Sequence, residues 1–231
     1  MSDDVLTRWP LAPASTADWL AELTQEDGLT GFEAPRRPDA AWVLGGMYER
    51  GENAGESVNH SQSRDEHPGP GWRRLRWAEL AARLGDPVVP PDTYPCFNCF
   101  PSERDADIRP GSVEWPAEGS LDRPTWDRLI GFLTEHSPQG PDTPCLAYYN
   151  PIIARDYDEK HIRSGRLGDA RALFDHPDIY YTPSNLWPAD RSWVVCTDYD
   201  LWATKVCGPG PLVEALLADA ELEAVRLPWT S

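Results

Sequence analysis

The segment DRSWVVCTDYDLWATKVCG, residues 190–208, decides the fold class of this chain. β-Branched and aromatic residues fill 193–197 and 202–206, and such residues favour strands. The DYD between them is typical of a turn, because aspartate side chains accept hydrogen bonds from nearby backbone amides. The segment is therefore predicted to form a β-hairpin whose first strand is half-buried, with its side chains alternating between two faces.

Further elements are predicted on the N-terminal and C-terminal sides of this hairpin. Ser15 and Asp122 are expected to be helix N-caps and Gly85 a C-cap, while Gly45-Gly46 favours a bend within a strand. The predicted helices are 16–25, 76–84 and 123–135, with shorter helical turns at 168–174 and within 212–225, and the predicted strands are 40–49, 112–115 and 145–150.

The order of these elements predicts an α+β fold. Strands and helices are interspersed without a regular βαβ rhythm, which favours a mainly antiparallel sheet with a few flanking helices. The 24 prolines and 17 glycines predict long Pro/Gly-rich loops between the elements. We expect a single domain, residues 1–231, in which the polar segment 50–71 is a long loop.

The charge of the chain limits its partners. There are 38 acidic side chains against 21 lysines and arginines, a formal net charge of -17. Phosphate backbones and anionic lipid surfaces bind basic proteins, so the sequence predicts no nucleic-acid partner and no membrane partner. A protein partner with a basic surface is electrostatically favoured.

The N-terminal residues and the cysteines predict a cytoplasmic protein. MSDDVLTRWPLAP is acidic and lacks an apolar run, so no signal peptide is expected. Five cysteines, an odd number, without an export signal indicate reduced thiols. Arginine in place of lysine, with abundant alanine, proline and tryptophan, indicates an actinobacterial source with a high-GC genome.

Cysteine and histidine patterns give no metal site and no cofactor. A structural zinc site needs four soft ligands, and Cys96-x-x-Cys99 has no second pair elsewhere in the chain. A redox pair would lie at the N-terminus of a helix, whereas CFNCFPS belongs to the proline-rich stretch 86–111 and no helix is predicted directly after it. The five histidines have no ligand spacing: His60, His67, His136, His161 and His176.

Two Asp-x-Asp pairs are the remaining candidates for chemistry. Asp156 and Asp158 form one pair, and Asp198 and Asp200 form the other. Alternate positions on an extended chain place both carboxylates on one side, where they could hold Mg²⁺. Two oxygen ligands do not define a site, however, and aspartate is also favoured in turns. We therefore interpret 198–200 first as the hairpin turn and second as a catalytic site.

Two segments resemble bacterial immunity proteins of the SUKH type. LAARLGDPVVPPDTY (80–94) is similar to the entry motif of that family, with Val-Pro in place of Leu-Pro, and PLVEALLADAELEAV (211–225) is similar to its last helix. The tryptophan-rich hairpin resembles, more broadly, segments of uncharacterised actinobacterial proteins. The SUKH resemblance implies an α+β cytosolic protein that binds and neutralises a toxin, and it carries over no catalytic residue.

Three functions are consistent with the sequence. The first is a non-enzymatic, immunity-like protein that binds a basic protein partner with an acidic surface. The second is a metal-assisted hydrolase using Asp198 and Asp200. The third is a structural or assembly component that carries an acidic face.

Overall fold

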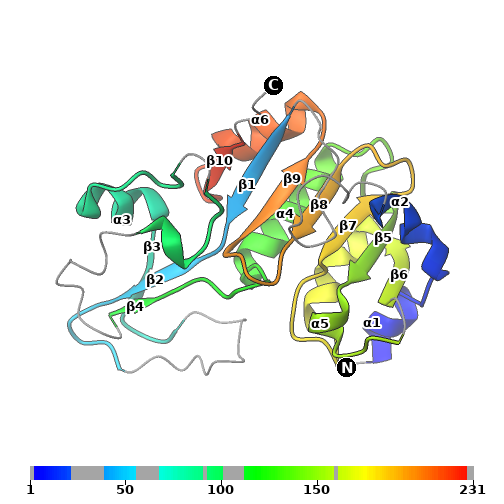
Figure 1. The fold of residues 1–231 in the computed structure, drawn as a ribbon, viewed down its shortest axis with the longest axis horizontal. Coiled ribbons are helices and arrows are strands. Elements are labelled where there is room, and N and C mark those ends of the chain that lie inside the picture. Colours follow the sequence, from blue (N-terminus) through cyan, green and yellow to red (C-terminus); the bar gives the residue numbers. More distant parts are fainter. Residues whose placement is uncertain are drawn as a thin grey trace.

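The computed structural model describes residues 3–21, 39–55, 68–90, 93–100, 112–158 and 161–227. Its main feature is a seven-stranded antiparallel sheet in the order β10-β1-β9-β8-β7-β5-β6, beside a three-stranded sheet in the order β3-β2-β4 (Figure 1). The strands are β1 Ala40–Leu44, β2 Met47–Arg50, β3 Trp72–Leu75, β4 Val113–Glu114, β5 Pro144–Tyr149, β6 His161–Arg166, β7 Asn185–Pro188, β8 Val194–Thr197, β9 Ala203–Cys207 and β10 Ala224–Arg226. The predicted α+β fold is thereby confirmed.

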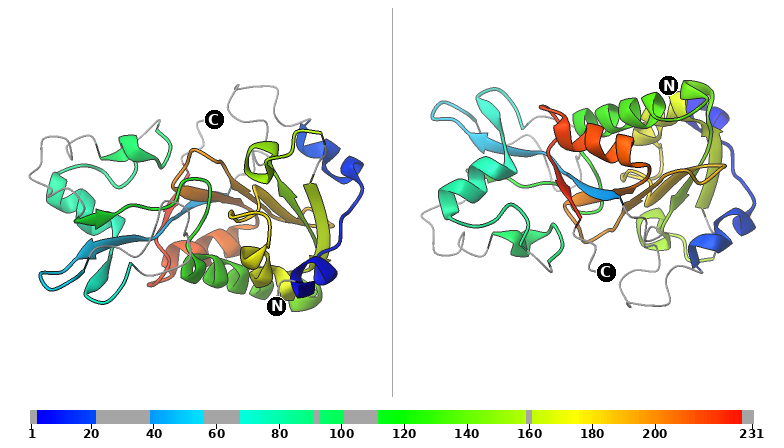
Figure 2. Two further views of the ribbon diagram at one scale, coloured as in Figure 1. Left: turned by 90° about the horizontal axis from the view of Figure 1, so that it is seen from below. Right: turned by 90° about the horizontal axis from the view of Figure 1, so that it is seen from above.

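Helices and short 3₁₀ segments surround the large sheet. Figure 2 shows α4 and α6 along one of its faces. The α-helices are α1 Asp3–Arg8, α2 Asp18–Ala21, α3 Trp77–Leu84, α4 Arg123–Glu135, α5 Pro151–Ala154 and α6 Gly210–Ala218, and the 3₁₀ helices are η1 Ala14–Ala17, η2 Phe97–Cys99, η4 Gly140–Asp142 and η5 Leu167–Asp175. No helix in the described ranges has the length and apolar content to cross a membrane.

The predicted hairpin lies at the centre of the large sheet, as β8 and β9. Every residue of both strands is buried, so the expectation of a half-buried strand was wrong. The reason is that both faces of the sheet are covered. Val195 packs against α4 in the main core, whereas Cys196 points to the opposite face, toward Leu20 of α2.

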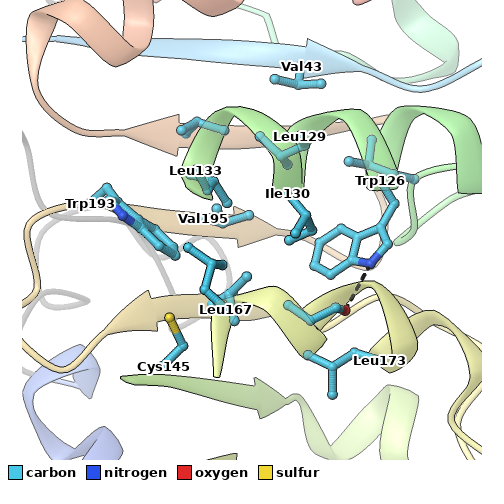
Figure 3. Packing of buried hydrophobic residues seen from close by; sticks show 14 of the residues in the cluster. Val43, Trp126, Leu129, Ile130, Leu133, Cys145, Leu167, Leu173, Trp193 and Val195 are labelled. Carbon is cyan, nitrogen blue, oxygen red and sulfur yellow. Dashed lines mark hydrogen bonds between the residues drawn. The ribbon is translucent and has the colours of Figure 1, made fainter. Parts of the chain in front are cut away.

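The main core lies between the large sheet and the helices α4, α6 and η5 (Figure 3). Leu129, Ile130 and Leu133 form the apolar face of α4, as its periodicity predicts. The indole N–H of Trp126 donates to the carbonyl oxygen of Ala170 in η5 at 3.2 Å, so the ring is buried without losing its hydrogen bond. Hydrophobic burial and a few satisfied polar groups thus hold the helices on the sheet.

Gly45-Gly46 connects the two sheets. The predicted bend in 40–49 is present, and it moves the chain from β1 in the large sheet to β2 in the small one. A Cβ on Gly45 would lie 2.8 Å from the carbonyl oxygen of Trp202, which explains why glycine is needed there. The amide of Gly46 donates to Oδ1 of Asp122 at 2.7 Å.

Asp122 stands at the N-cap position of α4, as predicted, but its carboxylate does not cap that helix. Besides the amide of Gly46, it accepts hydrogen bonds from Nη1 of Arg74 at 3.0 Å and from the hydroxyl of Thr125 at 2.7 Å. Since Arg74 belongs to β3, this carboxylate fastens the small sheet to the start of α4.

The other predicted elements differ mainly at their ends. Gly85 closes α3 with a φ of 74°, as expected of a C-cap. The predicted turn at 168–174 is the 3₁₀ helix η5, and the predicted helix 16–25 consists of η1 and α2 up to Ala21, with 22–25 outside the described residues. Residues 56–67 of the predicted loop 50–71 are likewise outside them.

The helical turns predicted within 212–225 are those of α6, but the end of this stretch is a strand that was not predicted. Helix α6 ends at Ala218, and residues from Ala224 form β10. Asp219 makes the break, because its Oδ1 accepts the amides of Glu221 and Leu222 at 3.0 and 2.7 Å. The chain then turns back and pairs with the edge of β1.

Asp219 gives the first testable prediction. Hydrogen bonds from Arg128 lower the pKa of its carboxyl group to about 2, and backbone amides add to the effect. A depressed pKa stabilises the fold above the unfolded-state value of about 4, and this stabilisation is lost as the pH falls toward 2. Asp219→Asn should therefore lower the urea midpoint at pH 7. The difference in urea midpoint between the parent and the variant should become smaller below pH 4. A difference that stays constant down to pH 2.5 would contradict a stabilising role of the Asp219 carboxylate.

Candidate functional site

Three loops enclose a cleft of about 520 Å³ at the end of the central hairpin. They comprise 93–98, the segment 116–119 before α4, and the hairpin turn 198–201. The cleft therefore combines parts of the chain that are far apart in sequence. Its lining residues are Thr93, Tyr94, Cys96, Asn98, Glu118, Asp200 and Leu201.

Backbone hydrogen bonds hold these loops together. The amide of Trp202 donates to the carbonyl oxygen of Pro95 at 2.8 Å, and that of Gly119 donates to Leu201 at 2.9 Å. Gly119 has a φ of 72°, and a Cβ there would lie 2.8 Å from Cα of Tyr199. Glycine is thus required both for the backbone conformation and for the close approach of the hairpin turn.

Both Asp-x-Asp pairs form turns. Oδ1 of Asp198 accepts the amide of Asp200 at 2.9 Å, and Oδ1 of Asp156 accepts the amide of Asp158 at 3.0 Å. The first aspartate of each pair therefore stabilises its own turn. Asp198 is half-buried, whereas Asp200 is exposed and lines the cleft.

The donor groups of the cleft do not form a metal cage. Within the ranges that the structure covers, no three His, Cys, Asp or Glu side chains gather in a way that could hold a metal ion. What the fold does bring together is Asp200, Glu118 and Cys96, from three different loops. No sequence pattern marks this grouping, because Cys96 and Asp200 are 104 positions apart in the chain.

The charged side chains in the described lining of the cleft are acidic. Its lining contains the carboxylates Glu118 and Asp200, and among the lining residues that the structure describes there is no lysine or arginine. The charge of Asp200 raises the pKa of the neighbouring Tyr199, with burial as a further cause. A cationic group is therefore the complementary ligand for this cleft.

The buried thiols of Cys99, Cys145 and Cys196 are not activated for catalysis. Cys96 precedes η2 and Cys99 ends it. Sγ of Cys99 donates to the carbonyl oxygen of Tyr94 at 3.1 Å, and burial raises the pKa of the Cys99 thiol. Burial also raises the pKa of Cys145 and Cys196 to about 12. Thiolates are the reactive species, and these thiols stay protonated at neutral pH.

The described histidines serve local structure. His136 is hydrogen-bonded through Nδ1 to the carbonyl oxygen of Phe132 at 2.9 Å, and Nε2 of His161 lies 2.9 Å from Oδ2 of Asp156. Nδ1 of His176 accepts the amides of Asp178 and Ile179 at 3.2 and 3.1 Å. The candidates His60 and His67 lie outside the described residues.

Three large exposed side chains that sequence reasoning missed lie in the chain near a buried cluster of Tyr149, Ile153 and Ile179. We call Ile152, Tyr157 and Tyr180 the tyrosine rim; they are 44%, 75% and 56% exposed. Tyr199, which precedes the cleft residue Asp200, packs against this cluster and interacts electrostatically with Tyr157. No periodic pattern marks these residues, because they lie in loops.

Comparisons of this chain with protein-family models, with curated proteins and with solved structures give no match.

Proposed function

We propose that this chain is a non-enzymatic cytosolic protein that binds a basic protein partner, in the manner of an immunity protein that neutralises a toxin. The observation that carries the proposal is the cleft beside the hairpin turn, where Glu118 and Asp200 face the solvent without a cation in the lining that the structure describes. Carboxylates in such a concave site favour a cationic ligand.

The overall charge supports the same function. A net charge of -17 on 231 residues creates a negative field that steers a basic protein toward the surface. Three loops from distant parts of the chain form the cleft, and loops positioned by a rigid scaffold commonly carry binding residues.

The metal-assisted hydrolase has less support. One carboxylate oxygen of Asp198 accepts a hydrogen bond from the amide of Asp200. The possible metal ligands that share the described lining of the cleft with Asp200 are Glu118 and Cys96, and this lining contains no histidine. The described lining thus offers two carboxylates, and no group of three possible ligands that could define a metal site is found among the described residues.

The test compares two charge variants with the same change in net charge. Glu118→Gln/Asp200→Asn removes both cleft carboxylates, whereas Asp142→Asn/Glu214→Gln removes two exposed ones on η4 and α6. Proteins captured from a native lysate by the parent and the control, but not by the cleft variant, are taken forward as partners, and the on-rate of the best one is measured.

We expect the on-rate to fall clearly between 0.01 M and 0.1 M salt, because the Debye length shrinks from ~30 Å to ~10 Å over this range. The cleft variant should associate at least about tenfold more slowly at 0.01 M salt, since steering changes on-rates by one to three orders of magnitude. A salt-independent on-rate, or equal losses in both variants, would refute the assignment of the partner to the cleft.

A further inference from the structure

The residues of the tyrosine rim lie close in the chain to one buried cluster. Tyr149, Ile153 and Ile179 form this cluster and are 0%, 5% and 3% exposed, and Tyr181 and Tyr199 pack against it. Ile152 and Tyr180 directly adjoin Ile153 and Ile179 in the chain, so the cluster anchors the backbone that carries them.

Side-chain hydrogen bonds fix the turns that present the rim. Asn150 caps α5, because its side-chain Oδ1 accepts the backbone amide of Ile152 at 2.7 Å. The backbone amide of Asn150 donates to Oγ of Ser184 at 3.0 Å. His176 accepts two amides of the turn before Tyr180. A surface whose loops are already ordered loses little conformational entropy when a partner binds.

Carboxylates lie close to both tyrosines in the chain. Asp156 and Asp158 flank Tyr157 in the chain, and Asp178 lies two residues before Tyr180. Asp158 and Asp178 are exposed, and so is the cationic Arg155. Exposed tyrosine rings next to carboxylates complement a guanidinium group, which stacks on an aromatic face and donates several hydrogen bonds in its plane.

We propose that the basic partner is recognised through an arginine-rich segment, whose guanidinium groups stack on Tyr157 and Tyr180 while its charge faces the neighbouring cleft. This inference rests on the proposed function and specifies the chemistry of the partner. Lysine satisfies the charge but lacks the planar group, so arginine is preferred at the rim. Tyrosine is also among the residues that contribute most at protein interfaces.

The experiment uses two fluorescent probes, an octa-arginine peptide and an octa-lysine peptide, in anisotropy titrations at 0.05 M salt. The parent should bind the arginine peptide about fivefold more tightly, in line with cation–π contacts at exposed sites. Tyr157→Ala/Tyr180→Ala should bring the ratio of the two affinities close to one. Tyr157→Phe/Tyr180→Phe retains the rings and should keep most of the preference, with circular dichroism confirming that all variants are folded.

The cleft variant Glu118→Gln/Asp200→Asn separates this inference from the proposed function. It should weaken the binding of both peptides and leave their ratio unchanged. Equal affinity of the parent for the two peptides, or an unchanged preference in the alanine variant, would overturn the arginine inference while the basic-partner function stands. If neither peptide binds the parent, both proposals fail.

Discussion

Trp193→Ala is expected to lower the free energy of unfolding by about 3–5 kcal/mol, the range for truncating a buried aromatic side chain. The ring is fully buried in the main core, beside β8. Its indole N–H donates to Oγ of Ser137 at 2.9 Å, so the substitution also leaves that hydroxyl without its donor. Urea unfolding followed by far-UV circular dichroism measures the change.

Trp193→Phe is the matched control. It keeps an aromatic ring in the core and removes only the indole N–H and part of the side-chain volume. Trp193→Phe should therefore lower the free energy of unfolding clearly less than Trp193→Ala does. If Trp193→Ala unfolds at the parent's urea midpoint, the hairpin does not have the central role in the core that its burial indicates.

Trp202→Ala should have an effect of similar size, about 3–5 kcal/mol, but at a different place. This ring lies in the second core, between the large sheet and the small one. It stacks on Trp115 with a centroid distance of 5.3 Å and meets the edge of Trp77 at 6.2 Å. Since Trp77 begins α3, the loss should loosen α3 and the small sheet first.

Hydrogen exchange locates this effect. Amides of β3 and α3, residues 72–84, should exchange faster in Trp202→Ala, whereas those of α4, residues 123–135, should change much less. Because the rings of Trp115 and Trp202 are in contact, the double variant Trp115→Ala/Trp202→Ala should lower the free energy of unfolding by less than the sum of the two single variants. Uniform acceleration across both helices would contradict a separate role for the second core.

Local sequence patterns were enough to identify most of the elements. The hairpin at 190–208 was predicted from β-branched and aromatic residues around a DYD turn, and the turn is closed by Asp198 itself. Helix α4 followed from its apolar periodicity and α3 from the same pattern with Gly85 as C-cap. These signals work because their causes lie within a few residues of one another.

Features that depend on distant contacts could not be predicted in this way. β10 was not predicted, since it is three residues long, follows a stretch rich in helix formers, and becomes a strand only by pairing with β1. The start of α3 is capped by Glu223, whose carboxylate accepts the amides of Trp77 and Ala78 at 2.8 Å each. No pattern near α3 contains that residue.

The sequence by itself determined the hairpin, the main helices, the α+β class and the negative charge, because propensity, periodicity and composition are local or additive. Only the tertiary structure decided which carboxylates share a cleft and which tyrosines stay exposed. Asp200 and Glu118 line one cleft because the hairpin turn packs on Gly119, and Tyr157 stays 75% exposed while Ile153 of α5 is buried in a cluster with Tyr149 and Ile179. Those outcomes depend on the packing of segments far apart in the chain, where the burial of one side chain is set by all the others.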